Sequence, residues 1–217
     1  MTYKDKIHVL LSPAERRLFK KLNTPAKIQD YLDTVPSNVL NSNQHTMMSP
    51  RAMLKAQRAH CVEGAMFAAA VLAYHGHEPL LMDLESSDDD LDHVVAVFKA
   101  GGRWGAISKT NYPVLRWRDP IYMSPRELMA SYFHEYFLDS GKKTLLRWGG
   151  PFSLKKYDPK TWVVAEGDID WVPEALGDAP HSPFAPASTL KKLRKASKIE
   201  IKTTLTREWA KGGKRLH

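Results

Sequence analysis

The chain of 217 residues contains a single cysteine, Cys61. One cysteine cannot form an intramolecular disulfide, and it excludes every zinc site that is built from several cysteines. The sequence also has no apolar run of about eighteen residues that could cross a membrane, and its charged N-terminal segment does not resemble a signal peptide. We therefore expect a soluble, cytoplasmic protein with no membrane contact, in which Cys61 is a buried apolar residue, a redox-sensitive thiol or a nucleophile.

Acidic residues are scarce at the C-terminal end of the chain. Residues 190–217 contain ten Lys and Arg but only Glu200 and Glu208, so this segment carries the whole net charge of +8. Residues 1–189 balance to zero and have the length of one globular domain. We expect a single domain over 1–189, with its core at about 25–140, followed by a basic tail. The tail is either a solvated end or a weak contact for nucleic acid or another acidic partner.

Four candidate helices in residues 1–137 begin at a Pro that follows a Ser or Thr directly. The hydroxyl can accept a hydrogen bond from a free N–H of a first helical turn, and Pro suits the first helical position because no donor is needed there. In two of these segments a Glu follows three residues after the hydroxyl, which is typical of a capping box. The pattern predicts helices over residues 13–22, 25–34, 50–58 and 125–137.

A long apolar segment predicts a buried central helix over residues 61–75, which a glycine ends. Three apolar runs follow this segment, and a Gly-Gly pair joins the last two as a tight hairpin. Signals beyond about residue 140 are weak, and we expect the Pro-rich residues 173–186 to form an irregular surface segment. The predicted strands form an antiparallel meander over residues 79–84, 93–98 and 103–108.

Cys61 would stand at the N-terminus of the central helix. There the free N–H groups and the helix dipole lower the pKa of a thiol and favour the nucleophilic thiolate. Such a nucleophile needs a base, and His93 opens the second predicted strand. His60 and His75 lie at opposite ends of the predicted helix, too far apart to share a metal ion. We expect neither a metal nor a cofactor.

Three short motifs follow one another in a characteristic order: Arg58-Ala-His-Cys61-Val-Glu-Gly-Ala65, Asp92-His93-Val-Val-Ala-Val-Phe98 and Gly101-Gly-Arg-Trp104. In this order and spacing they resemble the core of transglutaminase-like proteins of the small bacterial type, over about residues 25–112. The resemblance implies an α+β papain-like fold, in which N-terminal helices and a central Cys-bearing helix pack on an antiparallel β-sheet. It also implies that Cys61 is the nucleophile and His93 its base.

One position departs from the family's pattern. Four residues after Trp104, where the family has an aspartate that orients the histidine, this sequence has Ser108. A serine accepts the imidazole N–H but brings no negative charge, so it stabilises an imidazolium less well. Asn111 is the alternative orienting residue, because papain-like enzymes use an asparagine in this role. An oxyanion would be stabilised by the backbone N–H of Cys61 and a side-chain amide, for which the candidates are Asn41 and Gln57, with Asn38 and Gln44 as further possibilities.

Two functions stay open. The resemblance implies thiol-based acyl transfer, or amide or peptide hydrolysis, on a protein or peptide substrate, with Cys61, His93 and either Ser108 or Asn111. The alternative is a catalytically inactive scaffold that binds a protein or nucleic-acid partner. The carboxylates just before His93 lack the alternating spacing of a calcium loop, so we expect a solvated loop there.

Overall fold

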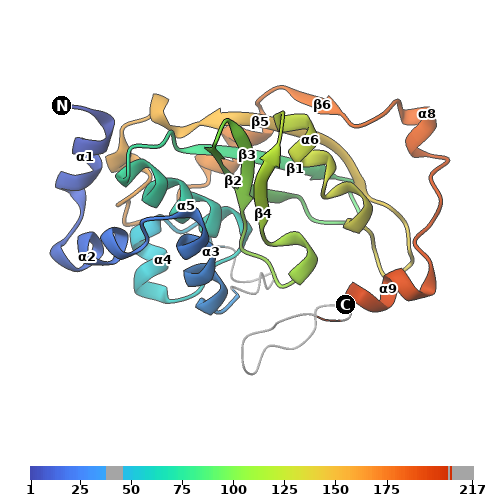
Figure 1. Ribbon diagram of the computed structural model, residues 1–217, viewed down its shortest axis with the longest axis horizontal. Helices are drawn as coiled ribbons and strands as arrows, with labels where there is room; N and C mark the ends of the chain where they lie inside the picture. The colour runs from blue at the N-terminus through green and yellow to red at the C-terminus, as the bar shows by residue number, and fades with distance from the viewer. Residues whose placement is uncertain (38–45, 205, 207–217) are drawn as a thin grey trace.

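The computed structural model describes residues 1–37, 46–204 and 206. It has an α+β fold in which helices pack on an antiparallel six-stranded sheet with strand order β4-β3-β2-β1-β5-β6 (Figure 1). This confirms the prediction of an α+β fold with helices packed on an antiparallel sheet. The strands are β1 (Leu80–Ser86), β2 (His93–Ala100), β3 (Arg103–Ile107), β4 (Arg118–Tyr122), β5 (Leu145–Ser153) and β6 (His181–Pro183). The α-helices are α1 (Tyr3–Leu10), α2 (Pro13–Lys21), α3 (Pro25–Thr34), α4 (Pro50–Ala56), α5 (Cys61–Tyr74), α6 (Pro125–Ala130), α7 (Trp171–Gly177), α8 (Ala187–Leu190) and α9 (Lys198–Thr204).

The predicted helix starts are correct. In α2, α3, α4 and α6 the Ser or Thr before the proline accepts a hydrogen bond from a first-turn N–H. The sequence analysis missed α1, although Thr2 and Asp5 form a complete capping box there. At the other end of α4, Gln57 adopts the left-handed conformation with φ 51°, which ends the helix before the predicted residue 58.

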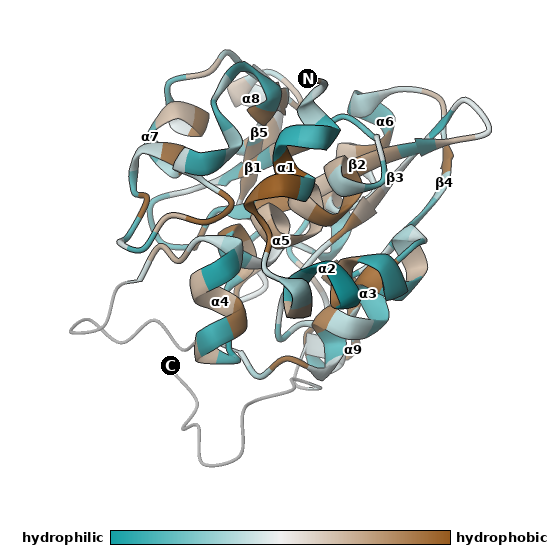
Figure 2. Ribbon diagram, turned by 90° about the vertical axis from the view of Figure 1, so that its left-hand side faces the viewer, coloured by the Kyte–Doolittle hydropathy of each residue, from teal (hydrophilic) through white to brown (hydrophobic). Residues whose placement is uncertain are grey.

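Helix α5 is the centre of the larger core. Every residue from Val62 to Tyr74 is buried, and the helix packs across β2. The N-terminal helices pack around it, with their hydrophilic residues coloured teal in Figure 2. Each large apolar side chain buried in this way contributes about 1.5–3 kcal/mol to folding. The predicted central helix is confirmed, and its burial fixes the position of Cys61 at its first residue.

The opposite face of the sheet carries a second, smaller core. Met82, Leu84, Val95 and Val97 alternate along β1 and β2 with residues that face α5. They pack against α6 and against the segment that follows it. Because both faces of the two central strands are covered, these strands are apolar nearly throughout, as the sequence shows.

The β2–β3 hairpin is formed as predicted. Gly101 and Gly102 have φ 56° and 75°, and two consecutive positive values are those of a type I′ turn. Together with β1, these strands form the expected antiparallel meander. The register then places Ser108, one residue beyond β3, diagonally opposite the start of β2.

Three expectations for the later part of the chain are wrong. The helix predicted for residues 125–137 ends at Ala130, where a short 3₁₀ turn over Phe133–Glu135 follows. The weak region beyond residue 140 contains β5, which is a central strand paired to β1 on one side and to β6 on the other. The Pro-rich residues 173–186 are not irregular, because they include most of α7 and all of β6.

Part of the basic segment 190–217 packs on the domain. Ala196 donates a backbone hydrogen bond of 2.9 Å to Gly141, and both Ala196 and Thr204 are buried. Within the described ranges, no helix combines the length and the apolar character needed to cross a membrane. Residues 207–217 lie outside the described residues, so the predicted nucleic-acid contact stays a prediction.

Candidate active site

Cys61 is the first residue of α5 and is partly buried. Burial raises the pKa of its thiol, but the interactions of the thiol with the rings of His60 and His93 hold that pKa well below its usual range. A lowered thiol pKa increases the fraction of thiolate, which is the nucleophilic form. The structure therefore brings together the predicted nucleophile and the predicted base.

His93 is the first residue of β2 and is buried. Its Nε2 lies 2.7 Å from the hydroxyl oxygen of Ser108, so the other ring nitrogen, Nδ1, is left for the thiol of Cys61. Ser108 is thus the residue that orients the imidazole, in the place where the resemblance suggested an aspartate. Cys61, His93 and Ser108 follow one another in the order of a catalytic triad whose third member is neutral.

Gln29 of α3 fixes the position of Ser108. Its side-chain amide donates to the backbone oxygen of Ser108 and its carbonyl accepts from the backbone N–H, at 2.9 Å each. The same amide also donates to Asp33, one turn further along α3. This two-point contact is buried, so it holds the end of β3 against the helical layer. Nothing in the sequence pattern marked Gln29.

The other predicted site residues have different roles or places. Asn111 does not orient His93, and its Oδ1 is buried with no hydrogen-bond partner among the residues that the structure describes. Gln57 donates its amide to Leu54 at the exposed end of α4, so no contact supports its predicted oxyanion role. Asn41, like the further candidates Asn38 and Gln44, lies outside the described residues.

His60 and Glu63 form a second polar group beside the thiol. His60 is the N-cap residue of α5, and its Nε2 lies 2.8 Å from the backbone oxygen of Thr46 and 3.4 Å from Oε1 of Glu63. The carboxylate of Glu63 accepts from the backbone N–H of His60, which is a capping contact. The sequence analysis considered His60 only as a metal ligand. The position of His60 directly before Cys61 in the sequence could have identified it as a neighbour of the thiol.

The acidic loop before His93 is held by separate contacts. Asp89 pairs with Lys142 at 2.8 Å, and Asp90 accepts from Thr144. Asp92 accepts from the backbone and side chain of Ser86. Because these carboxylates serve different partners, they do not converge; within the described ranges, no three His, Cys, Asp or Glu side chains are grouped as metal ligands.

A buried Asp–His pair lies on the face of the sheet that α5 covers. His181 on β6 extends across Gly149 on β5, and its Nε2 lies 3.0 Å from Oδ2 of Asp83 on β1. A side chain at position 149 would collide with the His181 ring, which explains the glycine. Burial raises the pKa of Asp83 to about 6, against the opposing effect of His181.

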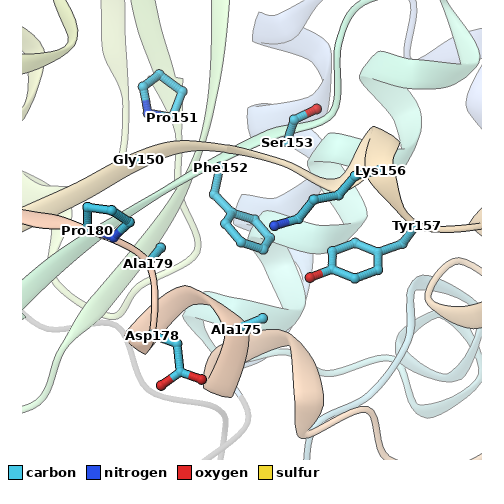
Figure 3. Close-up of a pocket in the computed structure, with 10 residues that line it drawn as sticks. All are labelled: Gly150, Pro151, Phe152, Ser153, Lys156, Tyr157, Ala175, Asp178, Ala179 and Pro180. Atoms are coloured by element: carbon cyan, nitrogen blue, oxygen red, sulfur yellow. The ribbon is translucent and has the colours of Figure 1, made fainter.

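A cavity of about 590 Å³ lies at the C-terminal end of β5 (Figure 3). Its lining includes Phe152, Tyr157 and Asp178, and the amine of Lys156 lies 3.9 Å from the centre of the Phe152 ring. None of the residues that contact the thiol lines this cavity. We therefore base the functional assignment on the side chains around Cys61 and not on this cavity.

No model of a known protein family matches this sequence. No curated protein matches it significantly either. A function for the chain must therefore come from the chemistry of Cys61 and its neighbours.

Proposed function

We propose that the protein is a cysteine enzyme of transglutaminase-like, papain-like type, which performs acyl transfer or amide hydrolysis. The single observation that carries the proposal is the position of Cys61, at the N-terminus of a buried helix, where its thiol interacts with His93, the first residue of a neighbouring strand. The arrangement of helices on an antiparallel sheet supports it, because a papain-like site is built between such layers.

The reaction uses the thiolate of Cys61. The sulfur attacks the carbonyl carbon of the substrate, the amine leaves with a proton from an imidazole, and the acyl group stays on the sulfur as a thioester. Water then releases an acid, or an amine accepts the acyl group as a new amide. We expect the N–H groups in the first turn of α5 to stabilise the developing oxyanion.

Acylation of the purified protein by an activated ester tests the proposal. With 4-nitrophenyl acetate we expect a burst of nitrophenol and an acetyl adduct on Cys61 by mass spectrometry. The Cys61→Ala variant should lose both the burst and this adduct, and it also reports any acetylation of lysines. Adding a primary amine separates the two outcomes, since amide formation indicates transfer and free acid indicates hydrolysis. Absence of a Cys61 adduct would contradict the proposal.

One observation favours the alternative of an inactive scaffold. The partner of His93 is the neutral Ser108, which does not stabilise an imidazolium as an aspartate does. A scaffold would show no burst, and its thiol would react with alkylating agents as slowly as a free cysteine does. These two measurements together distinguish the scaffold from the enzyme.

A further inference from the structure

Two imidazole rings interact with the thiol of Cys61, and only one of them belongs to the proposed triad. The other ring, His60, is 7% exposed. Its Nε2 contacts the backbone oxygen of Thr46, which can only accept, so Nε2 carries a hydrogen. Its Nδ1 is buried and has no hydrogen-bond partner among the described residues, and His60 is the N-cap residue directly before Cys61. In the neutral ring this Nδ1 holds a lone pair for the thiol proton.

A fixed carboxylate stands behind His60. Glu63 is fully buried, and its Oε1 accepts from the hydroxyl of Thr46 at 2.8 Å and from the backbone N–H of Met48 at 2.9 Å. The backbone N–H of His60 donates to Oε2 at 2.9 Å. These contacts leave the carboxylate 3.4 Å from Nε2 of the ring. A buried carboxylate so close to an imidazole stabilises its protonated form.

His93 has no such support. Its Nε2 faces the hydroxyl of Ser108, which can donate or accept and carries no charge. The hydroxyl therefore serves the neutral and the protonated ring about equally. Among the described residues, His93 has no carboxylate beside its Nε2, whereas His60 has the carboxylate of Glu63 beside its own Nε2.

We propose that His60 is a catalytic residue of this site and that His60, supported by Glu63, accepts the proton of the Cys61 thiol. The role of His60 in turnover rests on the function proposed above. The transfer of the thiol proton to His60 does not depend on that function. The proton moves from Sγ to Nδ1 of His60, and the electron pair of the S–H bond stays on sulfur. The thiolate forms the S–C bond while the π pair of the carbonyl moves to oxygen. When the C–N bond breaks, the leaving nitrogen takes the proton from Nδ1.

His93 then serves the second half of the reaction. Water or an amine gives a proton to Nδ1 of His93 as it adds to the thioester carbon. The S–C bond breaks, its electron pair returns to the sulfur, and the proton passes from His93 back to the sulfur. A ring held by a neutral hydroxyl suits this step, because the hydroxyl can accept from or donate to Nε2 while Nδ1 gains and loses the proton.

The charges around the two rings agree with this division. Burial lowers the pKa of His60, but its interaction with Cys61 and the charges of Cys61 and Glu63 raise it to about 9. The other titratable groups that act on the thiol from the packed elements are His93 on β2, Asp83 on β1 and Tyr136 after α6. Asp83 is engaged by the ring of His181, and the hydroxyl of Tyr136 donates to the backbone oxygen of Leu91.

Two matched variants test the proposal. In His60→Gln the new amide can replace the Nε2 contact with Thr46 but leaves nothing basic in the place of Nδ1. In His93→Gln the amide can replace the contact with Ser108 in the same way. The rate of Cys61 alkylation by iodoacetamide is measured from acidic to alkaline pH for each variant. Alkylation needs no substrate, so the result does not depend on whether the protein is an acyltransferase.

We expect His60→Gln to shift the alkylation profile to higher pH and to slow alkylation near neutral pH by about tenfold or more. His93→Gln should shift the profile less while abolishing turnover of the acetyl adduct. An equal or larger shift in His93→Gln, or an unchanged profile in His60→Gln, would overturn the proposal.

Two controls separate the chemistry from folding. His75→Gln, at the opposite end of α5, keeps a group for the contact with Phe19 and should leave the profile unchanged. If His60→Gln unfolds, His60→Asn replaces it, because its amide occupies the place of Nδ1 without being basic. The expected profile shift is the same for both variants.

Discussion

Gly64 in the first turns of α5 lies against the segment that follows the orienting Ser108. A Cβ atom at position 64 would stand 2.4 Å from the Cβ of Lys109, and ordinary carbon contacts are about 3.5–4.0 Å. The substitution Gly64→Ala therefore requires the two segments to separate by more than about 1 Å. The contacted atom is next to the backbone and Lys109 is buried, so no flexible side-chain end can move away.

Two effects of Gly64→Ala oppose each other. Alanine favours a helix over glycine by about 1 kcal/mol. Overpacking of a close contact costs about 1–3 kcal/mol, and we expect the upper end here because both partners are fixed to buried backbone. The net expectation is a loss of about 2 kcal/mol in the free energy of unfolding, or about 4–8 °C in melting temperature for a chain of this size.

Urea denaturation monitored by circular dichroism measures the effect. The matched control is Gly177→Ala at the end of α7, where a new Cβ would meet nothing within 4 Å. The control should be neutral or slightly stabilising. If Gly64→Ala is as stable as this control, the close packing of α5 against Lys109 is not as tight as described.

Three further substitutions have expected outcomes. Gln29→Met leaves the buried N–H and oxygen of Ser108 without their partner, so urea denaturation should show a loss of about 2–4 kcal/mol. Burial raises the pKa of Glu15, but hydrogen bonds from Arg51 and Ser12 lower it to about 2, so its contribution is complete above pH 4.5 and is lost as the pH falls toward 2. Arg51→Met should reduce this acid-induced loss by about 1 kcal/mol, and unchanged acid sensitivity would contradict the role of the pair. Asp83 binds its proton more tightly in the folded state, so its contribution to stability rises as the pH falls from about 6 to 3.8, and Asp83→Asn should remove that trend from melting curves.

The parts of the fold that follow from local chemistry were predictable. Ser12 and Ser49 cap helices because a hydroxyl directly before a first-turn proline can accept from the first-turn N–H groups. The apolar run of α5 and the glycine pair of the β2–β3 hairpin act within a few residues as well. The order of Cys61 and His93 then placed the thiol and its histidine close together, because the helix and the meander follow each other directly.

The remaining parts depend on distant partners. β5 contains Gly149, Gly150 and Pro151, which disfavour a strand locally, and it forms because β1 and β6 pair with it. The pattern could not show that the ring of His181 would extend over Gly149 to Asp83. The role of His60 was hidden for a similar reason, since its orientation depends on the backbone of Thr46 and on Met48, which holds Glu63 in place.

The protonation state of the single cysteine tests the central claim most directly. The ultraviolet absorbance of a thiolate, measured as the difference between the wild-type protein and Cys61→Ser during a pH titration, reports this one group alone. The account predicts that the thiolate is already present at neutral pH, because His60 and His93 both stabilise it. A thiolate signal that develops only near pH 8.5, as for a free cysteine, would contradict the account.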